Sequence, residues 1–217
     1  MARVGVVLSG CGFKDGAEIH ESVLTLLYLD QAGAEVSCFA PDRAQTQVVQ
    51  HITDEVVSES RNVLAESGRI ARGEIQDVRQ ANIDDLDAVI LPGGLGAASN
   101  LSSFATDGSD ATVDDGVAAL LKTAHAAGKP IGAICIAPAV VALTLGKEAP
   151  SLTIGNDEGT VTVLEQLGVS HVDCSVNACV VDPENKIATT PAYMIGPGIA
   201  DIASGIERLV AAVLKMI

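Results

Sequence analysis

The strongest chemical feature of the sequence is a cysteine placed where a predicted strand turns directly into a predicted helix. Residues 132–138 have the sequence GAICIAP, so Cys135 follows small and apolar residues and is followed at once by helical spacing. Enzymes use such an elbow to expose a nucleophile, and small neighbours permit its tight turn. A helix N-terminus also favours the thiolate, which is the reactive form. We therefore predict that Cys135 is a nucleophile. From this segment alone, an inert buried cysteine is an equal alternative.

Two glycines follow another predicted strand. Residues 87–91 have the sequence DAVIL and lead into Pro92, Gly93 and Gly94. Glycines at the carboxyl end of a strand let backbone N–H groups approach a reacting oxygen, as in an oxyanion hole. A tight turn needs the same residues and, taken alone, is the favoured interpretation. The chain has neither a complete GxGxxG sequence after a strand nor a Walker sequence, so phosphate binding is not indicated.

Glu21 is the candidate acid–base group. It lies in a predicted helix over residues 18–32, where Leu24 and Tyr28 make its side of the helix partly apolar. A carboxyl group that faces an interior has a raised pKa and can move a proton near neutral pH. An ordinary surface glutamate is the alternative interpretation, and Glu18, one turn earlier, competes for the same role.

The histidines are poorly placed for a cysteine–histidine pair. Ile136 occupies the position directly after Cys135, which excludes a dyad of adjacent residues. His171 and Asp173 have the pattern of a base and its orienting carboxylate, but they lie inside a predicted strand, so a structural histidine is the better interpretation. The others lie in helical or irregular segments with no evident partner: His20, His51 and His125.

The elements that must position these residues alternate along the chain. Residues 3–8 and 35–40 are predicted strands, and the helix between them ends at Gly33. A strand, a helix and a strand at this spacing form a βαβ unit, and hence a parallel sheet. With residues 88–91 and 131–134 as further strands, we predict an α/β fold: a mostly parallel central sheet with helices on both faces and Cys135 at its carboxyl edge.

The rest of the chain is less regular. Residues 46–57 and 61–70 have mixed helical character, and residues 95–116 resemble a loop over one end of the sheet. Thr112 or Asp114 is expected to cap a helix that runs to residue 127. Further predicted elements are an edge strand at residues 73–78, a helix at 136–145, strands at 152–154, 171–173, 180–182 and 186–189, and a closing helix from 198 or 199 to 216.

Composition and charge limit the partners. The 217 residues are 48% hydrophobic and 2% aromatic, which allows one α/β domain spanning residues 1–217 with an aliphatic core. A formal net charge of −15 repels phosphate backbones, so no nucleic-acid partner is expected. We also predict no membrane association, because no apolar stretch is long enough to span a bilayer.

The cysteines indicate a reducing compartment. The chain has 5 cysteines, an odd number in a protein too long to need disulfide bonds. Together with an N-terminus that lacks the apolar segment of a secretory signal, this predicts a cytoplasmic protein. Cys174 and Cys179 lie near His171 in sequence, but their spacing fits no common zinc pattern, so no metal is predicted.

Taken together, these motifs resemble the ThiJ/PfpI superfamily, of class I glutamine amidotransferase-like fold. Within it, the chain is similar to the ElbB type, called isoprenoid-biosynthesis glyoxalase. The resemblance runs along the whole chain. Its carriers are GVVLSGCG at residues 5–12, DGAEIHE at 15–21, LPGG at 91–94, ASNL at 98–101, the elbow at Cys135, LTIG at 152–155 and TTPAY at 189–193.

The resemblance implies a flavodoxin-like sandwich, a homodimer, and an active site without cofactor or metal. Cys135 matches the family's nucleophile and Glu21 its helix glutamate. Gly94 and the backbone N–H groups around Cys135 and Ile136, together with Gly93, match the oxyanion side, and the loop with Cys11 and Gly12 walls the pocket. Relatives carry a histidine on the strand after the elbow helix. This chain has Ile154 and Gly155 there, so the third member of the triad is absent or supplied elsewhere.

Three functions compete at this point. The first is a glyoxalase, independent of glutathione and metal, in which Cys135 adds to glyoxal or methylglyoxal and Glu21 moves a proton between carbons. The same attack on glycation adducts would make a protein deglycase. The second is a non-enzymatic redox-sensing or interaction protein with Cys135 as an oxidisable thiol. The third, amidase or amidotransferase chemistry, is least favoured because no histidine is well placed.

Overall fold

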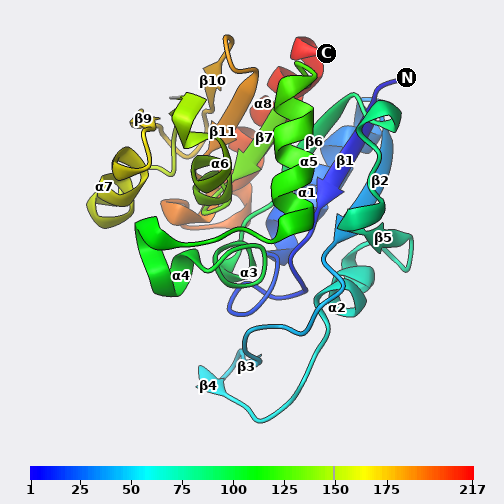
Figure 1. Cartoon of the computed structure of the whole chain (residues 1–217), viewed down its shortest axis with the longest axis vertical. Coiled ribbons are helices and arrows are strands. Elements are labelled where there is room, and N and C mark those ends of the chain that lie inside the picture. Colours follow the sequence, from blue (N-terminus) through cyan, green and yellow to red (C-terminus); the bar gives the residue numbers. More distant parts are fainter. Residues whose placement is uncertain (149) are drawn as a thin grey trace.

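A seven-stranded sheet forms the centre of the fold. The computed structural model describes residues 1–148 and 150–217. Within these residues the strand order is β10-β11-β7-β6-β1-β2-β5, and only β10 runs antiparallel to its neighbour (Figure 1). This confirms the predicted α/β, flavodoxin-like class. The strands are β1 (Arg3–Val7), β2 (Glu35–Ala40), β5 (Ile75–Asp77), β6 (Ala88–Leu91), β7 (Ile131–Ile134), β10 (Val180–Asp182) and β11 (Ile187–Thr190).

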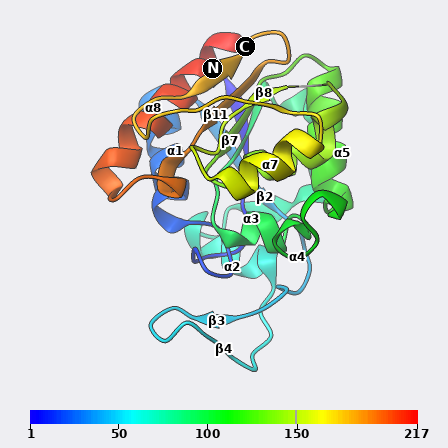
Figure 2. The ribbon, with the colours of Figure 1, turned by 90° about the vertical axis from the view of Figure 1, so that its left-hand side faces the viewer.

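Helices cover both faces of the sheet. Every residue of β6, β7 and β11 is buried, as expected for parallel strands packed on two sides. Figure 2 shows α1 and α8 on one side and α5 on the other. The helices are α1 (Ile19–Gln31), α2 (Val63–Ile70), α3 (Leu95–Ser99), α4 (Phe104–Asp107), α5 (Asp115–Ala126), α6 (Pro138–Leu145), α7 (Glu158–Gln166) and α8 (Ile199–Met216).

Local sequence explains where several helices begin and end. The carboxylate of Asp114 accepts hydrogen bonds from the N–H groups of Gly116 and Val117, so Asp114 rather than Thr112 caps α5. Gly33, with φ of 70°, follows α1 and reverses the chain into β2.

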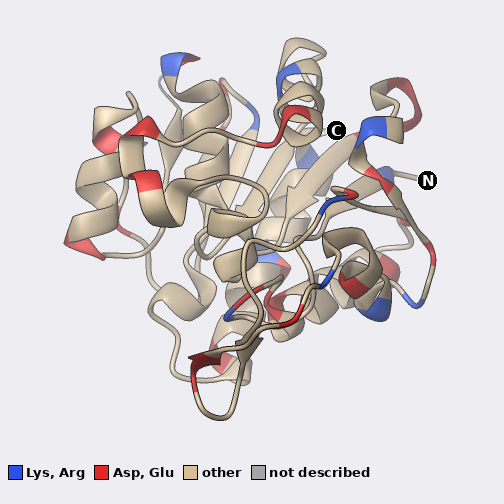
Figure 3. Ribbon diagram, turned by 60° about the horizontal axis from the view of Figure 1, so that its bottom comes forward, with Lys and Arg blue, Asp and Glu red and all other residues tan. Residues whose placement is uncertain are grey.

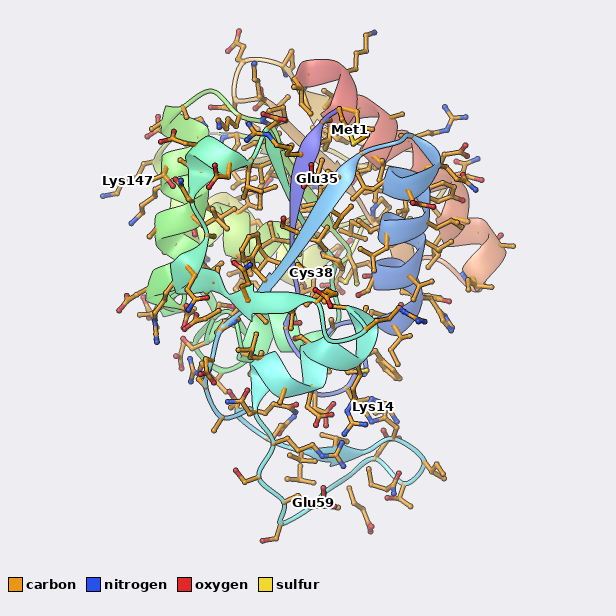
Figure 4. The ribbon with its side chains drawn as sticks, turned by 90° about the vertical axis from the view of Figure 1, so that its right-hand side faces the viewer. Met1, Lys14, Glu35, Cys38, Glu59 and Lys147 are labelled. Atoms are coloured by element: carbon orange, nitrogen blue, oxygen red, sulfur yellow. The ribbon has the colours of Figure 1, made fainter. Side chains whose placement is uncertain are left out.

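The predicted helical character of residues 46–57 is wrong. The segment instead forms a short antiparallel pair, β3 (Val49–Gln50) and β4 (Glu55–Val56), which we call the β3–β4 arm and which projects from the body (Figure 1). Contacts from a distant loop fix it in this shape. Asp15 accepts the N–H of Val49 at 2.7 Å, and the ammonium of Lys14 donates to the carbonyl of His51 at 2.8 Å. Figure 4 shows Lys14 where the arm joins the body.

Residues 95–116 are also more ordered than the loop expected from their composition. They contain α3 and α4, and the backbones of Ser102 and Val113 pair as an isolated bridge. The predicted strands near residues 152 and 171 exist as β8 (Ser151–Leu152) and β9 (Ser170–His171). They pair with each other outside the central sheet.

The surface is predominantly acidic. Figure 3 shows few Lys and Arg residues, scattered over several elements, among more numerous Asp and Glu residues. Of the helices among the described residues, none has both the length and the apolar character that crossing a bilayer requires.

Candidate active site

Cys135 lies at the carboxyl edge of the sheet, between β7 and α6. Its backbone has a φ of 60°, a value that side-chain-bearing residues rarely adopt. The N–H of Cys135 donates to the carbonyl of Thr190 at 2.9 Å, which continues the pairing of β7 with β11 to the last possible residue. The strained backbone of this turn therefore fixes the position of the thiol. Cys135 is 8% exposed.

The structure brings Glu21 to this thiol. Glu21 lies in the first turn of α1 and is fully buried. Its carboxylate accepts the N–H of Gly93 at 2.9 Å and the N–H of Tyr193 at 3.3 Å, and its side chain is hydrogen-bonded to that of Cys135. Glu18 takes a different role, because its carboxylate caps α1 by accepting the N–H of Glu21 at 2.7 Å.

The two glycines permit this close approach. A Cβ atom on Gly93 would lie 2.5 Å from the Cβ of Cys135 and 2.8 Å from the Oε2 of Glu21. Gly94 has a φ of 96°, and a Cβ there would collide with the backbone of residues 16–18. The N–H groups of Gly94 and Ile136 are hydrogen-bonded to the sulfur of Cys135. Of the predicted oxyanion groups, the N–H groups of Gly94 and Ile136 therefore lie at the thiol, whereas the N–H of Gly93 donates to the Oε2 of Glu21.

Burial dominates the protonation of the pair. Burial and, to a lesser extent, the nearby charge of Glu18 raise the pKa of Glu21 to about 8, against the opposing effect of the hydrogen bonds from Tyr193, Gly93 and Cys135. Burial also raises the pKa of the Cys135 thiol above its usual range, and an ionised Glu21 adds to this. The two groups therefore titrate as a coupled pair.

The expectation that the elbow favours a thiolate in the resting site is wrong. The N–H groups of Gly94 and Ile136 lower the pKa of Cys135, but they do not compensate for burial. The helix α6 begins at Pro138, three residues after Cys135. The thiol must lose its proton as it reacts.

The loop expected to wall the pocket supports the site from outside. The structure places Cys11 beside the charges of Glu66 and Arg69 of α2, and Gly12 against the imidazole of His51. The loop reaches the site through its backbone. Gly96 donates to the carbonyl of Gly16 at 2.9 Å, and Leu95 donates to that of Phe13 at 2.7 Å. These bonds hold the segment that carries Gly93 and Gly94.

Sequence reasoning missed His20 and Tyr193. The Nδ1 of His20 lies 2.8 Å from the Oη of Tyr193, although the residues are 173 positions apart. No local pattern indicates this pair, since one residue comes from α1 and the other from the turn after β11. His51 also has partners that the sequence does not indicate, because it accepts the N–H of Lys14 and its ring packs edge-on against Phe13. The interpretation of His171 fits better, because its imidazole is buried and accepts the N–H of Ile154 at 3.4 Å, as a structural histidine does.

Comparison with known proteins agrees with this geometry. Residues 11–189 match the DJ-1/PfpI family. The chain belongs to this family. A crystal structure of an isoprenoid biosynthesis protein with an amidotransferase-like domain from Ehrlichia chaffeensis superposes with a TM-score of 0.93 and 38% identity, covering 100% of this chain and 99% of the other. The predicted resemblance is therefore confirmed.

Two relatives of this DJ-1/PfpI chain correct its predicted location. The rat ES1 protein homolog, mitochondrial, is 44% identical over 99% of this chain and 84% of its own length. The human glutamine amidotransferase-like class 1 domain-containing protein 3, mitochondrial, is also 44% identical, over 99% and 83%. These mitochondrial relatives contradict the cytoplasmic prediction. Free cysteines indicate a reducing compartment and do not separate one such compartment from another.

In this DJ-1/PfpI chain, a side chain at position 155, one of the two positions where the family histidine is expected, would be strained and crowded. Gly155 has a φ of 97°, and a Cβ there would lie 2.8 Å from the Cγ2 of Ile195 and 3.2 Å from the Cβ of Pro191. The segment that carries Tyr193 therefore occupies the space into which a side chain at position 155 would extend.

Potential metal ligands do not gather elsewhere in the chain. Among residues 1–148 and 150–217, no group of three or more His, Cys, Asp or Glu side chains is arranged to hold a metal ion. Cys174 and Cys179 are free and half-buried. That the protein binds no metal stays a prediction, which elemental analysis of the purified protein tests.

Proposed function

We propose that this protein is a glyoxalase, independent of glutathione and metal, that converts glyoxal or methylglyoxal to a 2-hydroxy acid through a hemithioacetal on Cys135. Membership of the DJ-1/PfpI family supports a role of the DJ-1 type. The observation that carries the proposal is the buried carboxyl group of Glu21, which has a pKa near 8 and is hydrogen-bonded to the thiol. Such a carboxyl group is present in both protonation states near neutral pH, as proton transfer requires.

In the first step, the sulfur of Cys135 attacks the aldehyde carbon. The ionised form of Glu21 accepts the thiol proton, the S–C bond forms, and the carbonyl electron pair moves to oxygen. That oxygen then takes the proton back from Glu21, which gives a neutral hemithioacetal. Because the thiol ionises only as it attacks, a raised resting pKa is compatible with this step.

In the second step, the hemithioacetal isomerises to a thioester. The carboxylate of Glu21 takes the proton of the former aldehyde carbon, and the electron pair left behind forms the carbon–carbon double bond of an enediolate. Glu21 returns the proton to the neighbouring carbon, while the hydroxyl proton of the first carbon passes to the oxygen of the second. Water then attacks the thioester carbonyl, the C–S bond breaks, and the thiol of Cys135 regains its proton. The products are glycolate from glyoxal and lactate from methylglyoxal.

Turnover assays test this proposal. Glycolate and lactate formation is measured without glutathione and in the presence of a chelator, for the wild type and for Cys135→Ser. We expect product from the wild type and none from Cys135→Ser, with Cys179→Ser, a half-buried cysteine outside the site, as the control that keeps activity. A wild type that releases no 2-hydroxy acid contradicts the proposal. Release of free amine from glycated peptides at a higher kcat/KM would favour the deglycase alternative.

A redox-sensing role is the second candidate, and one observation favours it. The side chain of Glu21 and the N–H groups of Gly94 and Ile136 all bond to the sulfur of Cys135, so they are placed to stabilise an oxidised sulfur that carries oxygen atoms. Under this candidate, hydrogen peroxide converts Cys135 to a stable sulfinate in the wild type and to higher oxidation states in Glu21→Ala. Mass spectrometry of the peptide that contains Cys135 separates these outcomes.

A further inference from the structure

The proposed isomerisation requires more than the transfer of a carbon-bound hydrogen. When a hemithioacetal becomes a thioester, the hydroxyl oxygen on the first carbon loses a proton and the carbonyl oxygen on the second carbon gains one. Glu21 is occupied with the hydrogen that moves between the carbons. A second group that donates and accepts a proton at oxygen is therefore needed. This inference rests on the proposed function.

The turn after β11 holds Glu21 through the backbone of Tyr193, a residue that also carries a hydroxyl group. Tyr193 lies in the short helix η5 (Ala192–Met194), and its N–H donates to the Oε1 of Glu21 at 3.3 Å. The turn is tightly determined, because Ala192 is buried at a φ of 40° and Met194 donates to the carbonyl of Pro191 at 2.9 Å. The backbone that anchors the carboxylate of Glu21 is therefore the backbone that carries the phenol.

A histidine holds the phenol in place. The Oη of Tyr193 lies 2.8 Å from the Nδ1 of His20, and the two rings are 5.9 Å apart with a tilt of 48°. His20 precedes Glu21 in α1, and its Nδ1 lies 3.9 Å from the Oε1 of Glu18. The imidazole is half-exposed, so it lies where the site meets solvent.

We propose that Tyr193 is the second acid–base residue of the reaction and that His20 is its positioning residue. As Glu21 takes the carbon-bound hydrogen, the phenol of Tyr193 gives its proton to the carbonyl oxygen of the second carbon. As the thioester forms, the hydroxyl oxygen of the first carbon returns a proton to the phenolate. Both oxygens lie on the same side of a cis-enediol, so one hydroxyl group serves both. His20 donates its Nδ1–H to the phenolate between the two transfers.

The electrostatics of the turn agree with this assignment. Burial, with the negative charges of Glu18, Glu21 and Asp201, raises the pKa of Tyr193. The phenol therefore keeps its proton in the resting site and is available as a donor. The same charges disfavour the transient phenolate, which explains why an imidazole N–H beside it is useful.

The substitution Tyr193→Phe tests the proposal. We expect the hemithioacetal on Cys135 to form with glyoxal and to accumulate, as detected by mass spectrometry of the intact protein, while kcat for glycolate falls by about 100-fold or more. A purely structural role would not make the adduct accumulate. Tyr28→Phe, which removes the hydroxyl group of the other tyrosine of the chain, should behave like the wild type. The unfolding temperature of each variant serves as the folding control.

His20→Gln tests the positioning role. It should lower kcat by roughly 10-fold with little change in KM, in keeping with a lost hydrogen bond to a charged group, while His125→Gln on α5 should leave kcat unchanged. Wild-type kcat and no adduct accumulation in Tyr193→Phe would overturn the inference alone. A wild type that forms neither adduct nor glycolate would overturn the proposed function, and this inference with it.

Discussion

The carboxyl group of Glu21 and the thiol of Cys135 are hydrogen-bonded partners inside the protein, one from the first turn of α1 and the other from the elbow after β7. Both are buried, and burial raises the pKa of both. Neither group is therefore an ordinary acid of its kind: near neutral pH the thiol holds its proton, while the carboxyl group is present in both protonation states. The reactivity of the thiol then depends on transfer of its proton to the carboxylate during attack rather than on a preformed thiolate.

The raised pKa of Glu21 makes the fold sensitive to pH. The folded protein binds this proton more tightly than the unfolded chain, since the pKa rises from 4.5 to about 8. The stability that the folded state gains from binding this proton is fully present below pH 4.5 and is lost progressively as the pH rises through 8. We expect Glu21→Gln, which cannot ionise, to gain stability relative to the wild type between pH 5 and pH 9, by at most roughly 5 kcal/mol. Urea unfolding at several pH values measures the difference, and a constant difference would contradict it.

The alkylation of Cys135 by iodoacetamide should depend on the charge of Glu21. In the wild type, the apparent pKa of the thiol should lie above the free-cysteine value of about 8.5, because burial and the ionised carboxylate both raise it. Glu21→Gln removes the negative charge and should shift the alkylation profile to lower pH. The peptide that contains Cys135 is followed by mass spectrometry, so the other thiols do not interfere. Superimposed profiles for the two proteins would show that the carboxylate does not influence the sulfur.

We also predict a homodimer, and α1 offers the surface for it. Ile19, Val23 and Leu27 are 42%, 50% and 42% exposed. Their spacing of four residues places them along one side of the helix. Exposed apolar stripes of this kind are typical of interfaces. Val23→Asp should convert the dimer to a monomer in light scattering at micromolar concentration. Val172→Asp, at a similarly exposed site of 41%, should not. If light scattering gives the mass of a monomer for the wild-type protein, the homodimer is excluded.

The sheet and the elbow were predictable because their signals are local. Apolar runs followed by glycines predicted β1 and β6, and the small and apolar residues around Cys135 predicted β7 and the turn that the structure contains. The role of Glu21 could be predicted because the side of the helix that carries it is partly apolar. These features depend on residues that are neighbours in sequence.

The rest of the site depends on distant segments. The pairing of His20 with Tyr193 requires the crossing of α1 and the turn after β11, and the β3–β4 arm takes its shape from the carboxylate of Asp15. The net pKa of Cys135 was predicted in the wrong direction because burial, which the sequence does not quantify, outweighs the backbone N–H groups. The prediction of a cytoplasmic location was also wrong, because free cysteines do not distinguish one reducing compartment from another.

The substitution Gly93→Ala should reduce catalysis far more than it reduces stability. The N–H of Gly93 anchors Glu21 at 2.9 Å, and an added Cβ would lie 2.5 Å from the Cβ of Cys135 and 2.8 Å from the Oε2 of Glu21. Gly93→Ala therefore forces the carboxyl group and the thiol apart, at a cost of about 1–3 kcal/mol in stability. Glyoxal turnover should fall by about 100-fold, because misplacement of a reacting group by an ångström has an effect of this size.

The matched control is Gly68→Ala in α2, where the added Cβ would meet its nearest neighbour, Ile75, at 3.7 Å. Thermal unfolding and glyoxal turnover of both variants provide the test. If Gly93→Ala turns over glyoxal at the rate of Gly68→Ala, the close contact of Glu21 and Cys135 is not what the reaction uses.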